Sequence, residues 1–272
     1  MQRIISRQNA VVAQYREAAR GAADGTLLLD GAHIVSEALE AGLRFQHVVI
    51  ASDALDRPEI TRILSRLARQ ASDVVEASRP VMDAVSPVRS SSPIVALAAR
   101  PLPSHSPMDG AAPLVVVICD VQDPGNVGAI IRVAEGAGAS GVIVAGQSAD
   151  PFGWKALRGS MGSALRLPII SAATVEDAVR ALRQAGAQVI ATVPRHGTSL
   201  FEAALTGPAG LLIGGEGLGL SEAAVADADA RVTIPMEAPV ESLNAAVAAA
   251  ILLYEARRQR MGRGAPRARE RG

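Results

Sequence analysis

The stretch DVQDPGNVGAIIRVAEGAGASGVIVAG, residues 120–146, decides the fold. It follows the apolar run LVVVIC, passes through a polar turn and a helix-like segment, and ends in a second apolar run. Two apolar runs joined by a helical segment are typical of two parallel strands with a crossover helix. Pro124 and Gly125 favour a tight turn, and Asn126 is a natural N-cap for the helix. The stretch therefore predicts an α/β protein with a mainly parallel sheet.

Arg132 is the residue that this pattern does not explain. It lies nearly two turns into the predicted helix, among apolar neighbours. Arginine is rarely buried without a partner, so its side chain either extends to solvent or binds an anion. The helix pattern favours neither alternative.

Outside this stretch, proline and serine mark a boundary between two predicted domains. RPLPSHSPMDGAAP, residues 100–113, holds four prolines and is typical of a linker. Before it, the pattern predicts a small α/β domain over 1–99 that opens with a basic helix and continues with alternating strands and helices (helices 1–21, 32–42 and 58–70; strands 26–31, 47–52 and 73–78). After it, we expect a domain over 114–260 with the same alternation (strands 114–120, 141–146, 188–193, 210–215 and 231–236; helices 127–137, 174–186 and 242–260).

Composition predicts a soluble, cytoplasmic protein with no disulfide. The chain has 272 residues and is 49% hydrophobic, without an apolar run long enough to cross a membrane or form a signal peptide. Its one cysteine, Cys119, lies in an apolar run and is expected to be a buried thiol. The tail 261–272 is rich in arginine, so its composition predicts disorder; it either binds phosphate groups or has no function.

Two further segments have the composition of binding loops. GGEGLGLS, residues 214–221, matches neither the dinucleotide fingerprint nor the P-loop, which leaves a backbone-rich loop with one carboxylate, Glu216. A plain glycine-rich turn is the alternative. IPMEAPVESLNAAVAAAILLYEA, starting at Ile234, has Ser242 as a natural N-cap and Asn244 in the first helical turn. Its helix is apolar on most sides, which predicts burial in a core or a subunit interface.

Together, the order DPGNVGAIIR, GGEGLGLS and IPMEAPVESLNAAVAAAILLYEA resembles the three motifs of the SpoU, or TrmH, family of the SPOUT superfamily of RNA methyltransferases. The resemblance covers residues 114–260. LLLDGAHIVSEALEAG and SSPIVALAAR, within 1–99, are similar to the family's ribosomal-protein-like substrate-binding domain. The acidic character of the chain outside its arginine-rich tail departs from what an RNA-binding protein usually has.

The resemblance implies a deep trefoil knot, a homodimer through the C-terminal domain, and transfer of a methyl group from S-adenosylmethionine to a ribose 2′-hydroxyl in RNA. It implies no metal. Ribosomal RNA is favoured over transfer RNA. Five positions match the family's active site: Asn126, Arg132, Glu216, Ser242 and Asn244. The implied cofactor-binding positions are Gly214, Gly215, Leu218, Ile234, Met236, Leu243 and Asn244.

Two alternatives of other classes stay open from the sequence. One is a catalytically silent RNA-binding protein of the same fold, which cofactor binding would distinguish. The other is a nucleotide-dependent oxidoreductase, which the broken glycine fingerprint opposes. For Glu216 and Asn244, hydrogen bonding between loops is an alternative to a direct role in catalysis.

Overall fold

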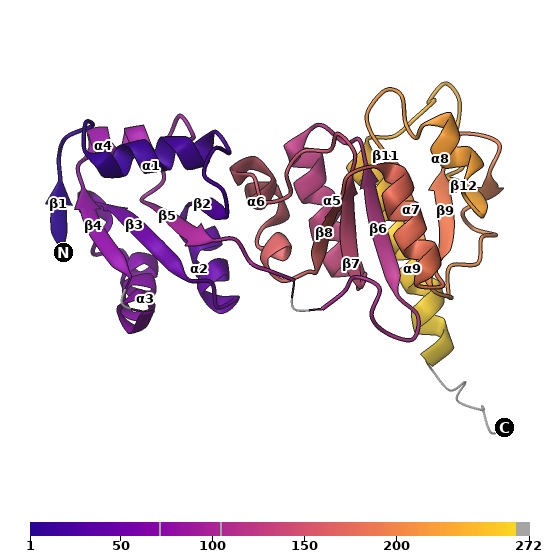
Figure 1. The fold of residues 1–272 in the computed structure, drawn as a ribbon, viewed down its shortest axis with the longest axis horizontal. Coiled ribbons are helices and arrows are strands. Elements are labelled where there is room, and N and C mark those ends of the chain that lie inside the picture. The colour runs from indigo at the N-terminus through magenta and orange to yellow at the C-terminus, as the bar shows by residue number, and fades with distance from the viewer. Residues whose placement is uncertain (71, 104, 265–272) are drawn as a thin grey trace. The chain divides into compact units, whose positions relative to one another are not determined.

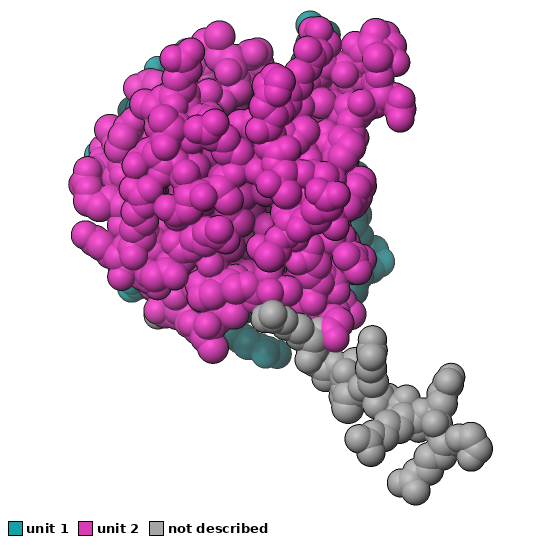
Figure 2. All heavy atoms as spheres, turned by 90° about the vertical axis from the view of Figure 1, so that its right-hand side faces the viewer, with its two compact units in different colours: residues 1–102, 151–166 teal, residues 103–150, 167–272 magenta. Residues whose placement is uncertain are grey.

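The computed structural model describes residues 1–70, 72–103 and 105–264. The chain divides into two compact units, coloured separately in Figure 2. Unit 1 contains residues 1–102 and 151–166, and unit 2 contains residues 103–150 and 167–272. The stretch 151–166 therefore belongs to the first unit, although it interrupts the second one in sequence. The arginine-rich tail from residue 265 on lies outside the described residues.

Unit 1 is built on a mixed five-stranded sheet in the order β1-β4-β3-β5-β2. Three strands, β1, β4 and β3, are parallel, and β5 runs antiparallel to both of its neighbours. The strands are β1 (Gln2–Ile4), β2 (Thr26–Asp30), β3 (Phe45–Ala51), β4 (Asp73–Ala77) and β5 (Ile94–Ala99). Its helices are α1 (Ala10–Ala19), α2 (Ala32–Glu40), α3 (Pro58–Leu67), α4 (Arg79–Val85) and α6 (Trp154–Ser160) (Figure 1).

The predicted opening helix over 1–21 is wrong in its first half. Residues 2–4 form β1, which pairs with β4, and α1 starts after Asn9, whose side chain accepts a hydrogen bond from the Val11 N–H. Arg3 lies on β1 and pairs with Glu76, so it is not part of a basic helix face. Strand pairing replaces the helix here because Ile4 is buried against the core, at 4% exposure.

A buried carboxylate holds the stretch 151–166 within unit 1. Asp30 accepts hydrogen bonds from the hydroxyls of Ser86 (2.8 Å) and Ser92 (3.0 Å) and pairs with Arg158 of α6 at 3.3 Å. The Asp30 side chain is only 3% exposed, so these three donors replace the water that it loses. An ion pair between Arg166 and Glu37 is a second anchor for the same stretch.

Unit 2 contains a seven-stranded sheet in which every pair is parallel, in the order β10-β12-β9-β11-β6-β7-β8. This confirms the predicted parallel sheet. The strands are β6 (Leu114–Cys119), β7 (Gly141–Ala145), β8 (Ile169–Ala172), β9 (Gln188–Thr192), β10 (Thr198–Ser199), β11 (Ala209–Gly214) and β12 (Ala230–Thr233). The helices are α5 (Pro124–Ala137), α7 (Val175–Gln184), α8 (Glu222–Ala226) and α9 (Ala245–Gly264).

Both faces of this sheet are covered by other elements, as the burial of every residue of the interior strand β6 shows. Val115, Val117 and Cys119 form a core cluster with the apolar face of α7. Alternate side chains of a strand point to opposite faces, so the remaining β6 residues face the other layer, where α5 packs against α9 (Figure 1). Burial raises the pKa of the Cys119 thiol to about 12, which confirms the predicted buried thiol.

The strand order reverses direction between β6 and β11. From β6 the chain continues through β7 to β8 on one side, whereas β9, β11 and β12 lie on the other. In open parallel sheets, such a switch point leaves a crevice at the carboxyl ends of the strands, where ligands bind. The trefoil knot stays a prediction. No helix in the described part of the chain is long and apolar enough to cross a membrane.

Candidate functional site at the sheet switch point

The turn after β6 carries the first predicted site residue, Asn126. Helix α5 begins two residues earlier than Asn126, with Pro124 in its first turn and Asp123 as the N-cap. The Asp123 carboxylate accepts a hydrogen bond from the Asn126 N–H at 2.9 Å. The prediction that Asn126 caps this helix is therefore wrong. Because Asp123 takes that role, the Asn126 side chain is free for contacts outside its own helix.

Three distant segments meet at Asn126. Its side-chain amide donates a hydrogen bond to the carboxylate of Glu216, in the loop after β11. Its side-chain oxygen accepts one from Asn244 Nδ2 at 3.1 Å. These contacts join the polar turn, the glycine-rich loop and the segment before α9, which the sequence placed in separate motifs. They are the loop-to-loop hydrogen bonds that the sequence left as an alternative for Glu216 and Asn244.

Asn244 also begins helix α9. Its Oδ1 accepts hydrogen bonds from the N–H groups of Ala246 (2.9 Å) and Val247 (3.3 Å), as an N-cap side chain does. The predicted cap, Ser242, lies two residues earlier, in a segment without regular secondary structure, so that prediction is wrong. With its oxygen held by the helix, Asn244 presents only its amide protons to Asn126, which sets the orientation of both side chains.

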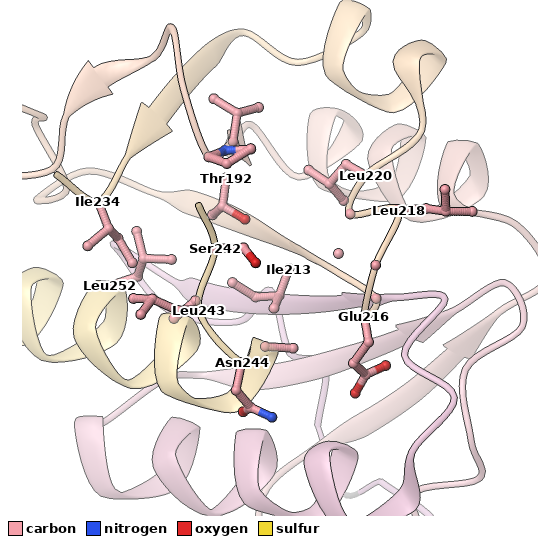
Figure 3. Close-up of a pocket in the computed structure, with 18 of the residues that line it drawn as sticks. Thr192, Ile213, Glu216, Leu218, Leu220, Ile234, Ser242, Leu243, Asn244 and Leu252 are labelled. Atoms are coloured by element: carbon pink, nitrogen blue, oxygen red, sulfur yellow. The ribbon is translucent and has the colours of Figure 1, made fainter. Parts of the chain in front are cut away.

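A cavity of about 470 Å³ opens beside these residues (Figure 3). It lies at the carboxyl ends of β9, β11 and β12, and α9 contributes to its floor. Its lining includes all seven predicted cofactor-binding positions and three of the five predicted active-site residues, with Asn244 in both sets (Gly214, Gly215, Glu216, Leu218, Ile234, Met236, Ser242, Leu243 and Asn244). Leu218 is part of this lining although the residue is 98% exposed.

Glycine is required at two positions of the cavity wall. A Cβ atom on Gly214 would collide with the backbone of Gly219 and Leu220, and one on Gly215 would collide with the carbonyl of Asp120. At these positions two backbone segments approach each other so closely that no Cβ atom fits between them, and only glycine is accommodated. The result is a rim of exposed peptide groups, suited to recognising a polar ligand.

One wall of the cavity was not predicted: it follows β9 and is formed by Thr192, Val193 and Pro194. Thr192 Oγ1 donates a hydrogen bond to the Leu212 carbonyl at 2.7 Å, which ties this wall to β11. The one feature of the sequence that could have indicated this wall is Pro194, directly after the predicted strand 188–193. Ile213 and Leu252 add apolar surface that was also not predicted.

Arg132 is not joined to this network. It is exposed on α5 and does not line the cavity, and no described residue forms a hydrogen bond or ion pair with it. Of the two alternatives that the sequence left open, the structure favours a side chain that extends to solvent. The described residues also hold no cluster of His, Cys, Asp and Glu side chains that could bind a metal ion.

Residues 113–254 match the model of the SpoU rRNA Methylase family. These residues contain β6, the Asn126 turn, the glycine-rich loop and the first half of α9. The chain belongs to this family. The family match thus covers the switch point and the whole cavity lining.

Relatives extend this family likeness over most of the chain. An uncharacterised tRNA/rRNA methyltransferase of Synechocystis is 32% identical over 266 residues, which cover 97% of this chain and 96% of that protein. The 23S rRNA (guanosine(2553)-2′-O)-methyltransferase of Bacillus subtilis is 31% identical over 234 residues, which cover 85% of this chain and 88% of the relative. Unit 1 is therefore shared with these SpoU relatives as well.

Solved structures have the same two-unit fold. An AdoMet-bound rRNA methyltransferase from Sinorhizobium meliloti superposes with a TM-score of 0.83 at 29% identity, covering 94% of this chain and 97% of that chain. The SpoU methyltransferase AviRb from Streptomyces viridochromogenes, in complex with AdoMet, has a TM-score of 0.81 at 31% identity and covers 93% and 99%. Both likenesses extend well beyond the family match at residues 113–254.

Proposed function

We propose that this chain transfers the methyl group of S-adenosylmethionine to a ribose 2′-hydroxyl in ribosomal RNA. The observation that carries the proposal is the meeting of Asn126, Glu216 and Asn244 at the rim of a cavity at the sheet switch point. Relatives named as 23S rRNA 2′-O-methyltransferases support both the reaction and the substrate.

The cavity suits S-adenosylmethionine in size and charge. A volume of about 470 Å³ is in the range of small-molecule sites. Ile234, Met236 and Leu243 offer apolar surface to an adenine ring, and the peptide groups around Gly214 offer polar partners for its edges. Among the described residues that line the cavity, Glu216 is the one with a charged side chain, and its negative charge favours a cationic sulfonium.

When bound, the cofactor supplies an electrophilic methyl group. The protein must then hold a ribose hydroxyl about 3 Å from that methyl carbon. Glu216 lies at the cavity rim and is fixed by Asn126, so we assign this pair to orienting the reacting groups. Ser242, also on the cavity lining, is a hydroxyl partner for the ribose or the cofactor.

Arg132 is assigned to the RNA phosphate beside the target ribose. It lies six residues after Asn126 on α5, about 9 Å along the helix axis. Helical side chains tilt towards the N-terminus, which directs Arg132 back towards the end that carries Asn126. A guanidinium stays protonated in proteins, so Arg132 does not act as the base. It clamps the phosphate by two hydrogen bonds, and the phosphate or a water molecule accepts the hydroxyl proton.

The two domains predicted from the sequence have separate roles in this proposal. Residues 1–99 bind RNA, and residues 114–260 bind the cofactor and perform the transfer. A homodimer forms through α9, where Val247, Tyr254 and Met261 are 48%, 55% and 63% exposed. These residues repeat every seven positions and therefore share one face of the helix. Tyr254→Glu should convert a dimer to a monomer in sedimentation experiments.

Methyl transfer is tested with labelled S-adenosylmethionine and total RNA from a strain that lacks the gene. We expect label in ribosomal RNA, at one ribose, with an Arg132→Ala control that incorporates little. Label in transfer RNA alone would overturn the substrate assignment. If isothermal titration shows S-adenosylmethionine binding but no RNA is labelled, the catalytically silent RNA-binding alternative is favoured. Binding of NAD instead would support the oxidoreductase.

A further inference from the structure

Asp120, directly after β6, has a backbone conformation that few residues other than glycine adopt. Its φ is 56°, in the left-handed region, where aspartate and asparagine are tolerated because their short side chains form local hydrogen bonds. Asp120 Oδ1 accepts such a bond from the Gln147 N–H at 2.7 Å. Because Gln147 follows β7, this bond joins the turns at the carboxyl ends of two neighbouring strands.

The same two turns are joined at the next residues. The Val121 N–H donates to Ser148 Oγ at 3.1 Å, and the Ala149 N–H donates to the Val121 carbonyl at 2.9 Å. Gly146 completes the fit, since a Cβ atom there would collide with the Asp120 carboxylate. The turn that leads to α5 is therefore held against the turn after β7 by these three hydrogen bonds, of which Asp120 makes the first.

On its other side, Asp120 is in contact with the glycine-rich loop. Its carbonyl occupies the space where a Cβ atom of Gly215 would lie. The residue after Gly215 is Glu216, which accepts the hydrogen bond from Asn126. Asp120 thus lies between the turn after β7 and the glycine-rich loop. It also precedes Asp123, the N-cap of α5, by three residues, and Asn126 lies in the first turn of that helix.

We propose that Asp120 is a positioning residue for methyl transfer. Its left-handed backbone and its bond to Gln147 set the direction in which the turn leaves the sheet, so that Asn126 reaches Glu216. This inference rests on the proposed function of the site. Asp120 does not line the cavity, so it acts through Asn126 and Glu216 rather than on the cofactor or the ribose.

Three substitutions separate the side-chain bond from the backbone conformation. Asp120→Asn keeps both the acceptor oxygen and the tolerance for positive φ, and we expect turnover within about threefold of the wild type. Asp120→Gly keeps only the conformation, and Asp120→Ala loses both. Small displacements of reacting groups lower rates steeply, so Asp120→Ala should lose at least about tenfold in kcat, with Asp120→Gly between the two.

Ser140→Ala is the matched control. Ser140 Oγ accepts a hydrogen bond from the Leu114 N–H at 3.0 Å, at the opposite end of the same strand, β6. Its loss should lower the melting temperature without changing kcat. If Asp120 is only structural, Asp120→Ala will behave like Ser140→Ala, and the proposal is overturned. A normal KM for S-adenosylmethionine with a lowered kcat supports positioning.

Hydrogen exchange gives a readout that does not depend on activity. In Asp120→Ala, we expect faster exchange in peptides covering 121–127 and 146–149, whereas Asp120→Asn and Ser140→Ala should leave these peptides protected. Unchanged exchange in Asp120→Ala overturns the positioning role, even if the wild type methylates RNA. If the wild type does not methylate RNA but Asp120→Ala still exchanges faster in these peptides, Asp120 arranges the loops and the proposed reaction is rejected.

Discussion

The side-chain amide of Asn126 bonds to the carboxylate of Glu216, although 90 residues separate them in the chain. One residue follows β6 and the other follows β11, which are adjacent parallel strands. Parallel neighbours end at the same edge of a sheet, so this pairing is a direct result of strand order. Asn244 then joins the pair from the start of α9. The site therefore depends on the sheet being fully assembled.

Asn126→Asp should be more harmful than Asn126→Ala. It removes the donor and places a second carboxylate against Glu216, so like charges repel. We expect kcat to fall about a hundredfold or more, with a lower melting temperature than that of Asn126→Ala. Adding Glu216→Gln returns a donor to the contact, and a double-mutant cycle should show stability coupling of about 0.5–3 kcal/mol. If the changes in the free energy of unfolding caused by the two substitutions simply add, the Asn126 and Glu216 side chains do not interact.

Arg132→Lys should lose most activity even though it keeps the positive charge. Lysine is a single charged point and cannot form the planar, two-bond contact with phosphate that arginine forms. Steady-state kinetics should show at least a tenfold loss in kcat/KM, while cofactor binding stays unchanged. Arg180→Lys is the control for a change of this type, because Arg180 is exposed on α7 and paired with Asp177. Near-normal turnover of Arg132→Lys would show that two-bond geometry is unimportant.

Gly215→Ala should abolish cofactor binding. Its added methyl group would collide with the Asp120 carbonyl, so the loop that forms the cavity wall must move. Titration calorimetry with S-adenosylmethionine measures the loss directly. Gly207→Ala is the matched control, because no atom lies within 4 Å of the position of its added Cβ. If both variants bind the cofactor normally, Gly215 is not part of a close-packed wall.

We expect acid to destabilise unit 1, because the pKa of the buried His47 is lowered in the folded protein. Burial lowers the pKa of His47, and the charge of Asp73 opposes that shift only partly. The unfolded chain therefore binds a proton more readily than the folded one, and stability falls as pH decreases through about 6.5, the ordinary pKa of histidine, towards the lowered folded value. The melting temperature at pH 5.5 should be below that at pH 7.5.

His47→Gln should reduce this pH dependence, and exposed His33→Gln should not. His47 also contacts the Tyr15 hydroxyl at 3.2 Å, so His47→Gln is expected to lower stability at every pH. The difference between the two pH values is therefore the informative quantity. An equal acid-induced decrease in His47→Gln and the wild type would assign the effect to other groups.

Local patterns in the sequence determined the elements of the sheet and the three motifs. The alternation of apolar runs with helical segments predicted β6, α5, β7 and the parallel arrangement, because burial on both faces demands continuous apolar strands. The start of α7 is also set locally, because the Thr174 hydroxyl accepts a hydrogen bond from the Asp177 N–H, three residues later, at 3.1 Å. These features depend on neighbouring residues only.

Tertiary structure decided the helix starts at the site. Asn126 and Ser242 are good caps by residue type, yet Asp123 and Asn244 take these roles. A cap forms only where the chain enters the helix in the right direction, and that direction depends on the sheet edge and on the adjacent loops. Residue type alone therefore could not choose among several polar candidates within a few positions.

The sequence by itself determined the two α/β folds, the parallel sheet and the three motifs that lie at or beside the cavity, because periodicity and motif order are properties of the chain. Only the tertiary structure decided that residues 2–4 form a strand, that 151–166 belongs to unit 1, and that Asn126 bonds to Glu216 and Asn244. These results depend on contacts between residues far apart in sequence, whose energies local patterns do not contain.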